Sequence, residues 1–132
     1  MPRFSYNSNE HLATACPQLQ EIFRAVIEHY DCTIIQGHRT EIEQNEYFRT
    51  GRSKVEFPNS KHNHMPSTAV DVAPYPIDWN DKDRFYHFAG YVEGVAKMKG
   101  YRTRWGGDWD RDHDFRDQTF MDLVHFEYLG AI

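Results

Sequence analysis

The sequence has few cysteines and no long apolar run. Cys16 and Cys32 are the only cysteines among 132 residues, and two thiols cannot make a disulfide framework. Both stand in apolar surroundings, so we expect buried free thiols. No stretch approaches the roughly 18 apolar residues of a membrane span, and the first residues lack the apolar core of a signal peptide. We therefore expect no membrane partner and a chain made in a cytosol.

Positive charge is also scarce. The chain has 15 Lys and Arg against 20 Asp and Glu, which gives a net charge of −5. This negative net charge argues against a protein that binds nucleic acid mainly through its phosphates. The hydrophobic fraction of 39% and the aromatic fraction of 15% exclude a chain that is disordered by composition. We expect a single folded domain over residues 1–132, working as a monomer.

Hydrophobic periodicity predicts helices that alternate with short strands. Ser8 is the expected cap of the first helix, Pro17 suits the first turn of the second, and Thr40–Glu43 has the form of a capping box. The sum is an α+β domain with a small, mostly antiparallel sheet packed against helices. The expected helices cover residues 9–16, 17–30, 40–51 and 81–99, and the expected strands cover 32–36, 68–73, 101–105 and 120–129.

Three segments carry more polar and ionisable side chains than a core needs. They are Ser60–His64 with Asp71, Asp122–His125 and Gly37–Thr40. Asp71 and His125 lie between apolar residues in expected strands, where an unpaired carboxylate or imidazole is costly. Each alone fits a hydrogen-bonded core residue equally well. With a histidine of the run Ser60–His64 they supply two imidazoles and a carboxylate, the ligand set of a catalytic zinc site with one open position. The third segment is Gly37–Thr40, with Gln44 one helical turn later.

The order of these motifs resembles a family of zinc peptidases that includes D-alanyl-D-alanine carboxypeptidases and phage endolysins. The run His64–Asp71 is similar to the family signature H-x-x-G-x-A-x-D, and Asp122-x-x-His125 is similar to its second signature. The resemblance implies a fold of the hedgehog/D-Ala-D-Ala-peptidase type. Weaker similarities lie in Gly37–Thr40 with Gln44, in Gly51–Lys54 and in Trp105–Trp109, so that the resemblance spans about residues 33–128.

The resemblance also implies roles for individual residues. His64, Asp71 and His125 would be the ligands of Zn²⁺. Asp122 would be the general base, which activates the attacking water and then passes its proton to the leaving amine. Arg39 would bind substrate or the developing oxyanion. The alternative for Arg39 is a plain surface ion pair.

Two departures from the family pattern concern the first ligand. Ser67 stands where the family has glycine, and His62 stands where it has serine, two places before the ligand. Two histidines therefore compete for one role, and we favour His64 because its spacing to Asp71 fits. His62 would then lie behind the metal site, on the substrate side, or simply in a loop. Ser60, His62 and Gln44 are weaker candidates for substrate binding, with a helix-to-core hydrogen bond as the alternative for Gln44.

An acidic run lies in the expected loop before the last strand. Asp108, Asp110, Asp112 and Asp114 occupy every second position, a spacing with which an oxygen-rich loop can wrap calcium. The run lacks the central glycine and distal glutamate of an EF-hand, and Arg111 interrupts it. A solvated acidic loop is the alternative to a Ca²⁺ site.

The resemblance favours a zinc-dependent peptidase that hydrolyses a bond in peptidoglycan stem peptides. The expected bond is L-alanyl–D-glutamate, as in phage endolysins, which act from the host cytoplasm after their release to the wall. A D-alanyl-D-alanine carboxypeptidase of the same family is one alternative, and a non-catalytic zinc-containing binding module is another. A metal nuclease is suggested by the run His62–His64, but the acidic net charge counts against it.

Overall fold

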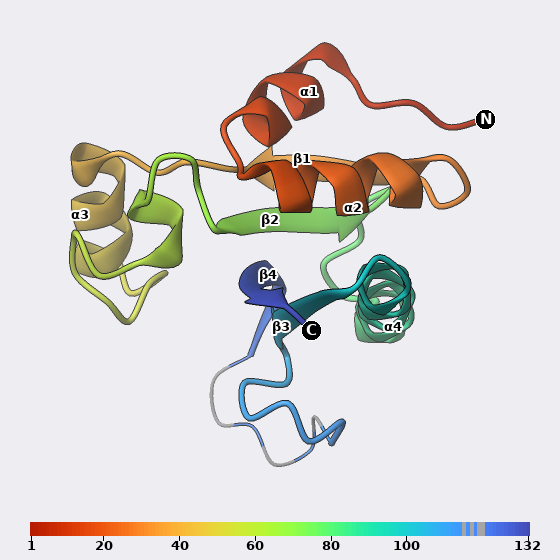
Figure 1. Cartoon of the computed structure of the whole chain (residues 1–132). Coiled ribbons are helices and arrows are strands. Elements are labelled where there is room, and N and C mark those ends of the chain that lie inside the picture. The colour runs from red at the N-terminus through yellow and green to blue at the C-terminus, as the bar shows by residue number, and fades with distance from the viewer. Residues whose placement is uncertain (115, 117, 119–120) are drawn as a thin grey trace.

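Four α-helices and a four-stranded antiparallel sheet form the part of the chain that this computed structural model describes, namely residues 1–114, 116, 118 and 121–132 (Figure 1). This architecture confirms the expected α+β class. The helices are α1 (Tyr6–Ala13), α2 (Pro17–Ile27), α3 (Glu41–Arg49) and α4 (Lys82–Met98), with a short 3-10 turn, η1 (Lys61–Asn63). The strands are β1 (Cys32–Gln36), β2 (Ala69–Pro74), β3 (Tyr101–Gly106) and β4 (Asp122–Ala131).

The sheet has the strand order β1-β2-β4-β3, so the last strand of the chain lies between β2 and β3. Helix α1 packs against β1, and α4 packs against β2, β3 and β4. Helix α2 packs against α4 and completes this helical layer, whereas α3 and η1 lie together beyond one end of β2 (Figure 1). One face of the sheet is therefore covered by helices, and the other is available for a site.

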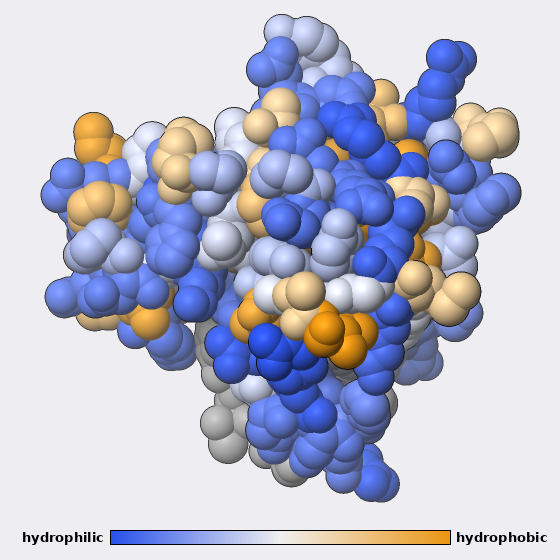
Figure 2. All heavy atoms as spheres, viewed as in Figure 1, coloured by the Kyte–Doolittle hydropathy of each residue, from blue (hydrophilic) through white to orange (hydrophobic). Residues whose placement is uncertain are grey.

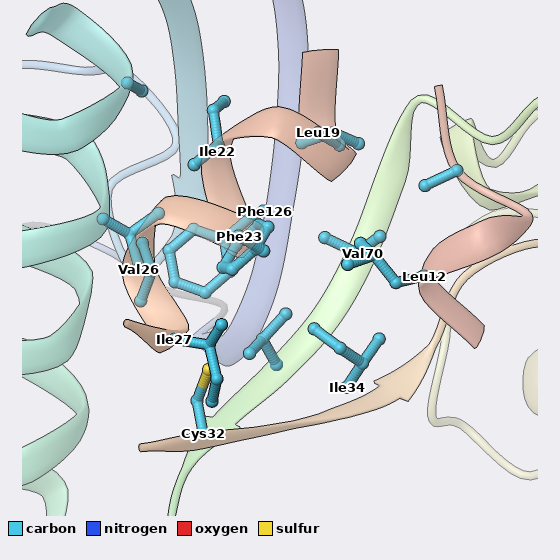
Figure 3. Close-up of a cluster of buried hydrophobic side chains, with 14 of the residues drawn as sticks. Leu12, Leu19, Ile22, Phe23, Val26, Ile27, Cys32, Ile34, Val70 and Phe126 are labelled. Atoms are coloured by element: carbon cyan, nitrogen blue, oxygen red, sulfur yellow. The ribbon is translucent and has the colours of Figure 1, made fainter. Parts of the chain in front are cut away.

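The core lies between the sheet and the helical layer. Phe126 of β4 is fully buried there, and its ring meets the edges of Phe23 of α2 and Phe88 of α4 at centroid distances of 5.6 and 6.0 Å. Figure 3 shows Phe126 beside the apolar face of α2 and near Val70 of β2. Because side chains alternate along a strand, the neighbours of Phe126, namely His125 and Glu127, point to the opposite face. The core thus fixes the orientation of two polar residues.

The N-terminal helix differs from its expected bounds. Its cap is Ser5, whose hydroxyl accepts a hydrogen bond from the backbone N–H of Ser8 at 3.1 Å, so the predicted start after Ser8 is wrong. Ser8 is instead buried inside the helix, where its hydroxyl accepts from the backbone N–H of Ile34. A hydrogen bond to a strand 26 residues away has no local sequence signal.

Most other boundaries lie within about two residues of the prediction, although α2 ends at Ile27 rather than at residue 30. Strand β1 has the expected bounds, and Thr40 caps α3 in a full capping box with Glu43. Cys16 and Cys32 are buried free thiols, as expected. The last strand begins at Asp122 rather than 120, and Phe120 lies outside the described residues.

The face of the molecule in Figure 2 is mostly hydrophilic, with small apolar groups between polar residues. In the described part of the chain, no helix combines the length and the hydropathy needed to cross a membrane.

Candidate metal centre

Three buried side chains, His62, Asp71 and His125, converge on the face of the sheet opposite the core. Asp71 Oδ1 lies 3.1 Å from His62 Nε2 and 3.4 Å from His125 Nδ1, and the two nitrogens are 3.2 Å apart. A tetrahedral zinc ion about 2.0–2.1 Å from each ligand would hold its ligand atoms about 3.3 Å apart. The three separations therefore fit a zinc ion between these atoms.

Strand pairing and a capped turn bring the three residues together. Asp71 of β2 lies directly opposite His125 of β4 in the antiparallel register. His62 comes from η1, which Ser60 and Asn63 cap reciprocally: the Ser60 hydroxyl accepts from the backbone N–H of His62, and the Asn63 side chain accepts from that of Ser60. The turn is held against the segment that precedes α3, because the carbonyl oxygen of His62 accepts a hydrogen bond from the backbone N–H of Arg39 at 2.8 Å.

Hydrogen bonds on the far side of each ring set the imidazole tautomers. His62 Nδ1 lies 2.8 Å from the carbonyl oxygen of Gly37, which can only accept, so Nδ1 carries the hydrogen. His125 Nε2 lies 2.9 Å from the Glu127 carboxylate and donates to it in the same way. Each ring therefore turns its other nitrogen toward the cluster, where a bound metal would take the place of any proton. This is the arrangement in which histidine binds a metal.

The electrostatics of the cluster favour a cation. Burial opposes ionisation of Asp71, but the two imidazoles outweigh burial and hold the pKa of Asp71 well below its usual range. Burial likewise opposes a charged His125, yet hydrogen bonds to Asp71 and Glu127 raise the pKa of His125 to about 9. Burial is also outweighed at Glu127, where His125 and Arg104 lower the pKa to about 2. The carboxylates thus stay charged around a site that attracts positive charge.

His64 does not belong to this cluster, and the structure brings His62 rather than His64 together with Asp71 and His125. Its side chain is exposed, and its Nδ1 lies 3.4 Å from the hydroxyl of Thr68. The physical reason is that η1 turns His62 toward the sheet, whereas His64 follows the turn in extended backbone. The spacing Ser60-x-x-Asn63 was a usable signal, because two reciprocal caps indicate a turn that contains His62.

Arg39 borders the cluster from the side of Asp71. It is 5% exposed, and its Nη2 donates to Asp71 Oδ2 at 3.4 Å. Its Nε donates to the Gln36 side chain, and its guanidinium lies over the ring of Tyr47, 4.1 Å from the centroid. Arg39 is therefore buried and held in place rather than part of a surface ion pair, and it steadies the carboxylate oxygen that faces away from the imidazoles.

Gln44 is buried next to Arg39 and is not among the residues that line the cleft, which favours the alternative of a helix-to-core hydrogen bond. Its side-chain oxygen accepts from Arg39 Nη1 at 3.0 Å. Its amide nitrogen donates to the hydroxyl of Ser53 and the carbonyl of Val55 at 2.9 and 2.8 Å. Gln44 thus ties Arg39 to the segment after α3. The other two weak candidates, Ser60 and His62, do line the cleft.

Asp122 faces the same cleft as His125 because the register of the sheet shifts between them. Trp105 of β3 pairs with Phe126, but the next residue, Gly106, pairs with Asp122. Gly106 permits this approach, since a Cβ there would lie 2.1 Å from the carbonyl oxygen of Asp122. Burial and the charge of Asp71 raise the pKa of Asp122, against the opposing effect of His125. This shift in register explains how Asp122 and His125, which are three residues apart on β4, face the same cleft.

The cluster lies in a cleft of about 840 Å³. The segment after α3 forms a basic wall with Arg52 and Lys61, and Trp79 and Trp109 line other parts. Trp109 also contacts the ring of His125 at a centroid distance of 5.4 Å. The sequence interpretation gave no role to Glu127, although its position two residues after His125 predicts that the two side chains share a face of the strand.

The acidic run is partly brought together. Carboxylate oxygens of Asp108, Asp110 and Asp112 lie within 4.8 Å of one another, whereas Asp114 is paired with Arg116. Asp108 is buried, and its carboxylate accepts from the backbone N–H of Asp112 and His113. These hydrogen bonds let Asp108 stabilise the turn of the loop. Calcium binding by the acidic run stays a prediction.

Comparisons with known proteins are consistent with this geometry. A family model described as phage L-alanyl-D-glutamate peptidase matches residues 1–129. The L-alanyl-D-glutamate peptidase of Escherichia phage T5 is 37% identical over 121 residues, which cover 88% of this chain and 88% of that protein. The crystal structure of the Serratia marcescens L-Ala D-Glu endopeptidase ChiX superposes with a TM-score of 0.77 at 27% identity, and the match covers 96% of this chain and 90% of that one.

Proposed function

The chain belongs to the phage L-alanyl-D-glutamate peptidase family, and from this premise we propose that it hydrolyses the L-alanyl–D-glutamate bond of peptidoglycan stem peptides, using zinc held by His62, Asp71 and His125. The observation that carries the proposal is the convergence of two ring nitrogens and one carboxylate oxygen, 3.1–3.4 Å apart, in a large cleft. Zinc bound by three such ligands keeps one position open, polarises a carbonyl and lowers the pKa of water.

The residues around the cluster supply the remaining chemistry. Asp122 lines the cleft beside His125, where its carboxylate takes the proton of the attacking water and delivers it to the leaving amine. Arg39 holds Asp71 in place, and its positive charge stabilises negative charge that develops on the scissile carbonyl oxygen. Glu127 holds the His125 ring with its Nδ1 aimed at the cluster.

The family favours this endopeptidase over the alternatives raised by the sequence, namely a D-alanyl-D-alanine carboxypeptidase, a binding module and a nuclease. Within the proposal, residues 1–132 act as one catalytic domain and as a monomer. The protein stays in the host cytoplasm until it is released to the wall. Ca²⁺ at the acidic loop is a separate prediction, which calorimetric titration of the zinc-loaded protein with calcium would test.

Mass spectrometry of digested peptidoglycan tests the proposal. We expect new amino groups on D-glutamate after digestion, abolished by a chelator and restored by zinc. Release of only a terminal D-alanine would replace the proposal with a carboxypeptidase. Intact peptidoglycan after incubation with protein that is shown to contain zinc would replace it with a binding module.

A further inference from the structure

We propose that Arg52, assisted by Lys61, binds the free carboxylate of the D-glutamyl residue and so selects acidic stem peptides over amidated ones. This inference rests on the proposed function, and it assigns the part of the cleft that holds the leaving side of the substrate. Arg52 lines the cleft from the segment that follows α3, and Lys61 lines it from η1.

The chemistry of the scissile bond requires a cation in this cleft. A glutamyl residue that is joined onward through one carboxyl group keeps the other as a free carboxylate. When its nitrogen belongs to the scissile amide, that carboxylate lies within the same residue as the bond. A carboxylate that leaves water without a partner is costly. The binding site for the leaving side must therefore offer a positive group.

Two of the cationic side chains in the cleft already donate hydrogen bonds to other groups of the protein. Arg39 donates to Gln36, to Gln44 and to Asp71, and it is buried. Arg104 donates from both Nε and Nη2 to the Glu127 carboxylate, at 3.1 and 2.8 Å. Neither guanidinium can give its hydrogen-bonding edge to a substrate carboxylate without leaving these partners.

The side chain of Arg52, in contrast, is exposed, while its backbone is held by hydrogen bonds. The backbone N–H groups of Arg52 and Ser53 both donate to the carbonyl of Tyr47, at 2.9 and 3.1 Å, which fixes the turn after α3. The guanidinium of Arg52 lies over the Tyr47 ring, 5.3 Å from its centroid. A guanidinium placed over an aromatic face keeps its N–H edge available, and that edge matches a carboxylate with two parallel hydrogen bonds.

The same tyrosine places Arg52 close to the reacting groups. Its ring also carries Arg39, which contacts Asp71 of the metal cluster. Lys61 directly precedes His62 in η1 and lines the same cleft. Arg52 and Arg39 therefore contact the same Tyr47 ring, and Arg39 in turn contacts the metal cluster. The second cation, Lys61, is adjacent in sequence to the proposed metal ligand His62.

The local charge of this wall is opposite to that of the whole chain. Residues 52–61 contain Arg52, Lys54 and Lys61 against one acid, Glu56, whereas the chain as a whole has a net charge of −5. A positive wall in an acidic protein draws an acidic peptide toward one side of the cleft and orients it there. This asymmetry fits a substrate that is anionic on one side of the scissile bond.

Two peptides that differ at one group test the inference. Both contain L-alanyl–D-glutamyl, but the second has the free carboxylate converted to an amide. For the zinc-loaded wild type we expect kcat/KM to favour the acidic peptide. Arg52→Ala should lower kcat/KM for the acidic peptide by about 10- to 100-fold, the size of one charge-assisted hydrogen bond, and change the amidated peptide little. Arg52→Lys should restore part of the preference.

Arg49→Ala is the matched control. Arg49 lies three residues earlier, is exposed, pairs with Glu46 and does not line the cleft, so its loss removes the same charge without altering the preference. Arg52→Gln, which keeps the stem over Tyr47, replaces the alanine variant if zinc content or circular dichroism shows that the latter is misfolded. A wild type that cleaves neither peptide would refute the proposed function. A wild type that cleaves both equally, or an Arg52 variant with an unchanged preference, would refute this inference alone.

Discussion

Asp71 on β2 lies directly opposite His125 on β4, and Oδ1 of the carboxylate is 3.4 Å from Nδ1 of the ring. The pair is flanked on the core side by Val70 and Phe126, which face each other in the same register and are fully buried. Hydrophobic burial on one face of the sheet therefore fixes the register that aligns two ligands on the other, since a shift by one residue would exchange the faces.

Substitution of the two competing histidines should separate their roles. His62→Ala removes a nitrogen from the cluster and should weaken zinc binding by more than about 100-fold, the upper end for residues that only support a ligand. His64→Ala should leave zinc content unchanged, because His64 is exposed and outside the cluster. Metal analysis after dialysis against a weak chelator gives the answer. Loss of zinc from His64→Ala with retention in His62→Ala would reverse the assignment.

Asp122→Ala should retain zinc and lose activity. A general base contributes typically about 100- to 10,000-fold, and the ligand atoms of the cluster do not include Asp122. The measurement is kcat on a soluble stem peptide, with zinc content determined on the same sample. Asp83→Ala, an exposed substitution on α4, is the control for the loss of one acid. Wild-type turnover in Asp122→Ala would remove Asp122 from the mechanism.

Glu127→Gln should weaken zinc binding while the fold is kept. The variant still accepts a hydrogen bond from His125, but it loses the negative charge and the ion pair with Arg104. We expect zinc affinity to fall by about 10- to 100-fold, as for other groups that orient a metal-binding histidine. Competition with a zinc-binding dye measures the change, with exposed Glu10→Gln as control. Equal affinities of Glu127→Gln and wild type would contradict the proposed support.

Phe126→Ala should destabilise the protein by about 3–5 kcal/mol, because it empties a fully buried site between Phe23 and Phe88. Denaturant unfolding should be followed in chelator, since bound metal adds its own stabilisation. Ile42→Ala, at a side chain that is 82% exposed, should change the free energy of unfolding by less than about 0.5 kcal/mol. Similar midpoints for the two variants would contradict the described core.

The two thiols should be inert in the folded protein. Burial raises the pKa of Cys32 to about 12, with a further contribution from Asp31, and burial also raises the pKa of Cys16. Because the thiolate is the reactive form, a raised pKa keeps reactivity low at pH 8 and lets it grow only as the pH approaches that pKa. A disulfide reagent should label both thiols quickly in denaturant and slowly without it. Rapid labelling of the native protein would contradict this burial.

Local signals predicted much of the fold, whereas long-range contacts decided the rest. The capping box at Thr40 and the β-branched run of β1 lie in adjacent residues of the sequence. Strand β1 has the expected bounds, and α3 begins directly after Thr40, although it ends at Arg49 rather than near residue 51. Ser8 has the side chain of a helix cap, but its hydroxyl accepts a hydrogen bond from a distant strand instead. Spacing along the chain favours His64 over His62, whereas η1 decides which histidine faces the sheet. The buried position of Gln44 likewise depends on a loop that folds back over α3.

Anomalous X-ray diffraction at the zinc edge, on crystals of the zinc-loaded protein, tests the central claim most directly. We predict one strong peak about 2.0–2.2 Å from His62 Nε2, His125 Nδ1 and an oxygen of Asp71. A peak bound by His64 in place of His62, or zinc found only at the acidic loop of Asp108, Asp110 and Asp112, would contradict the account.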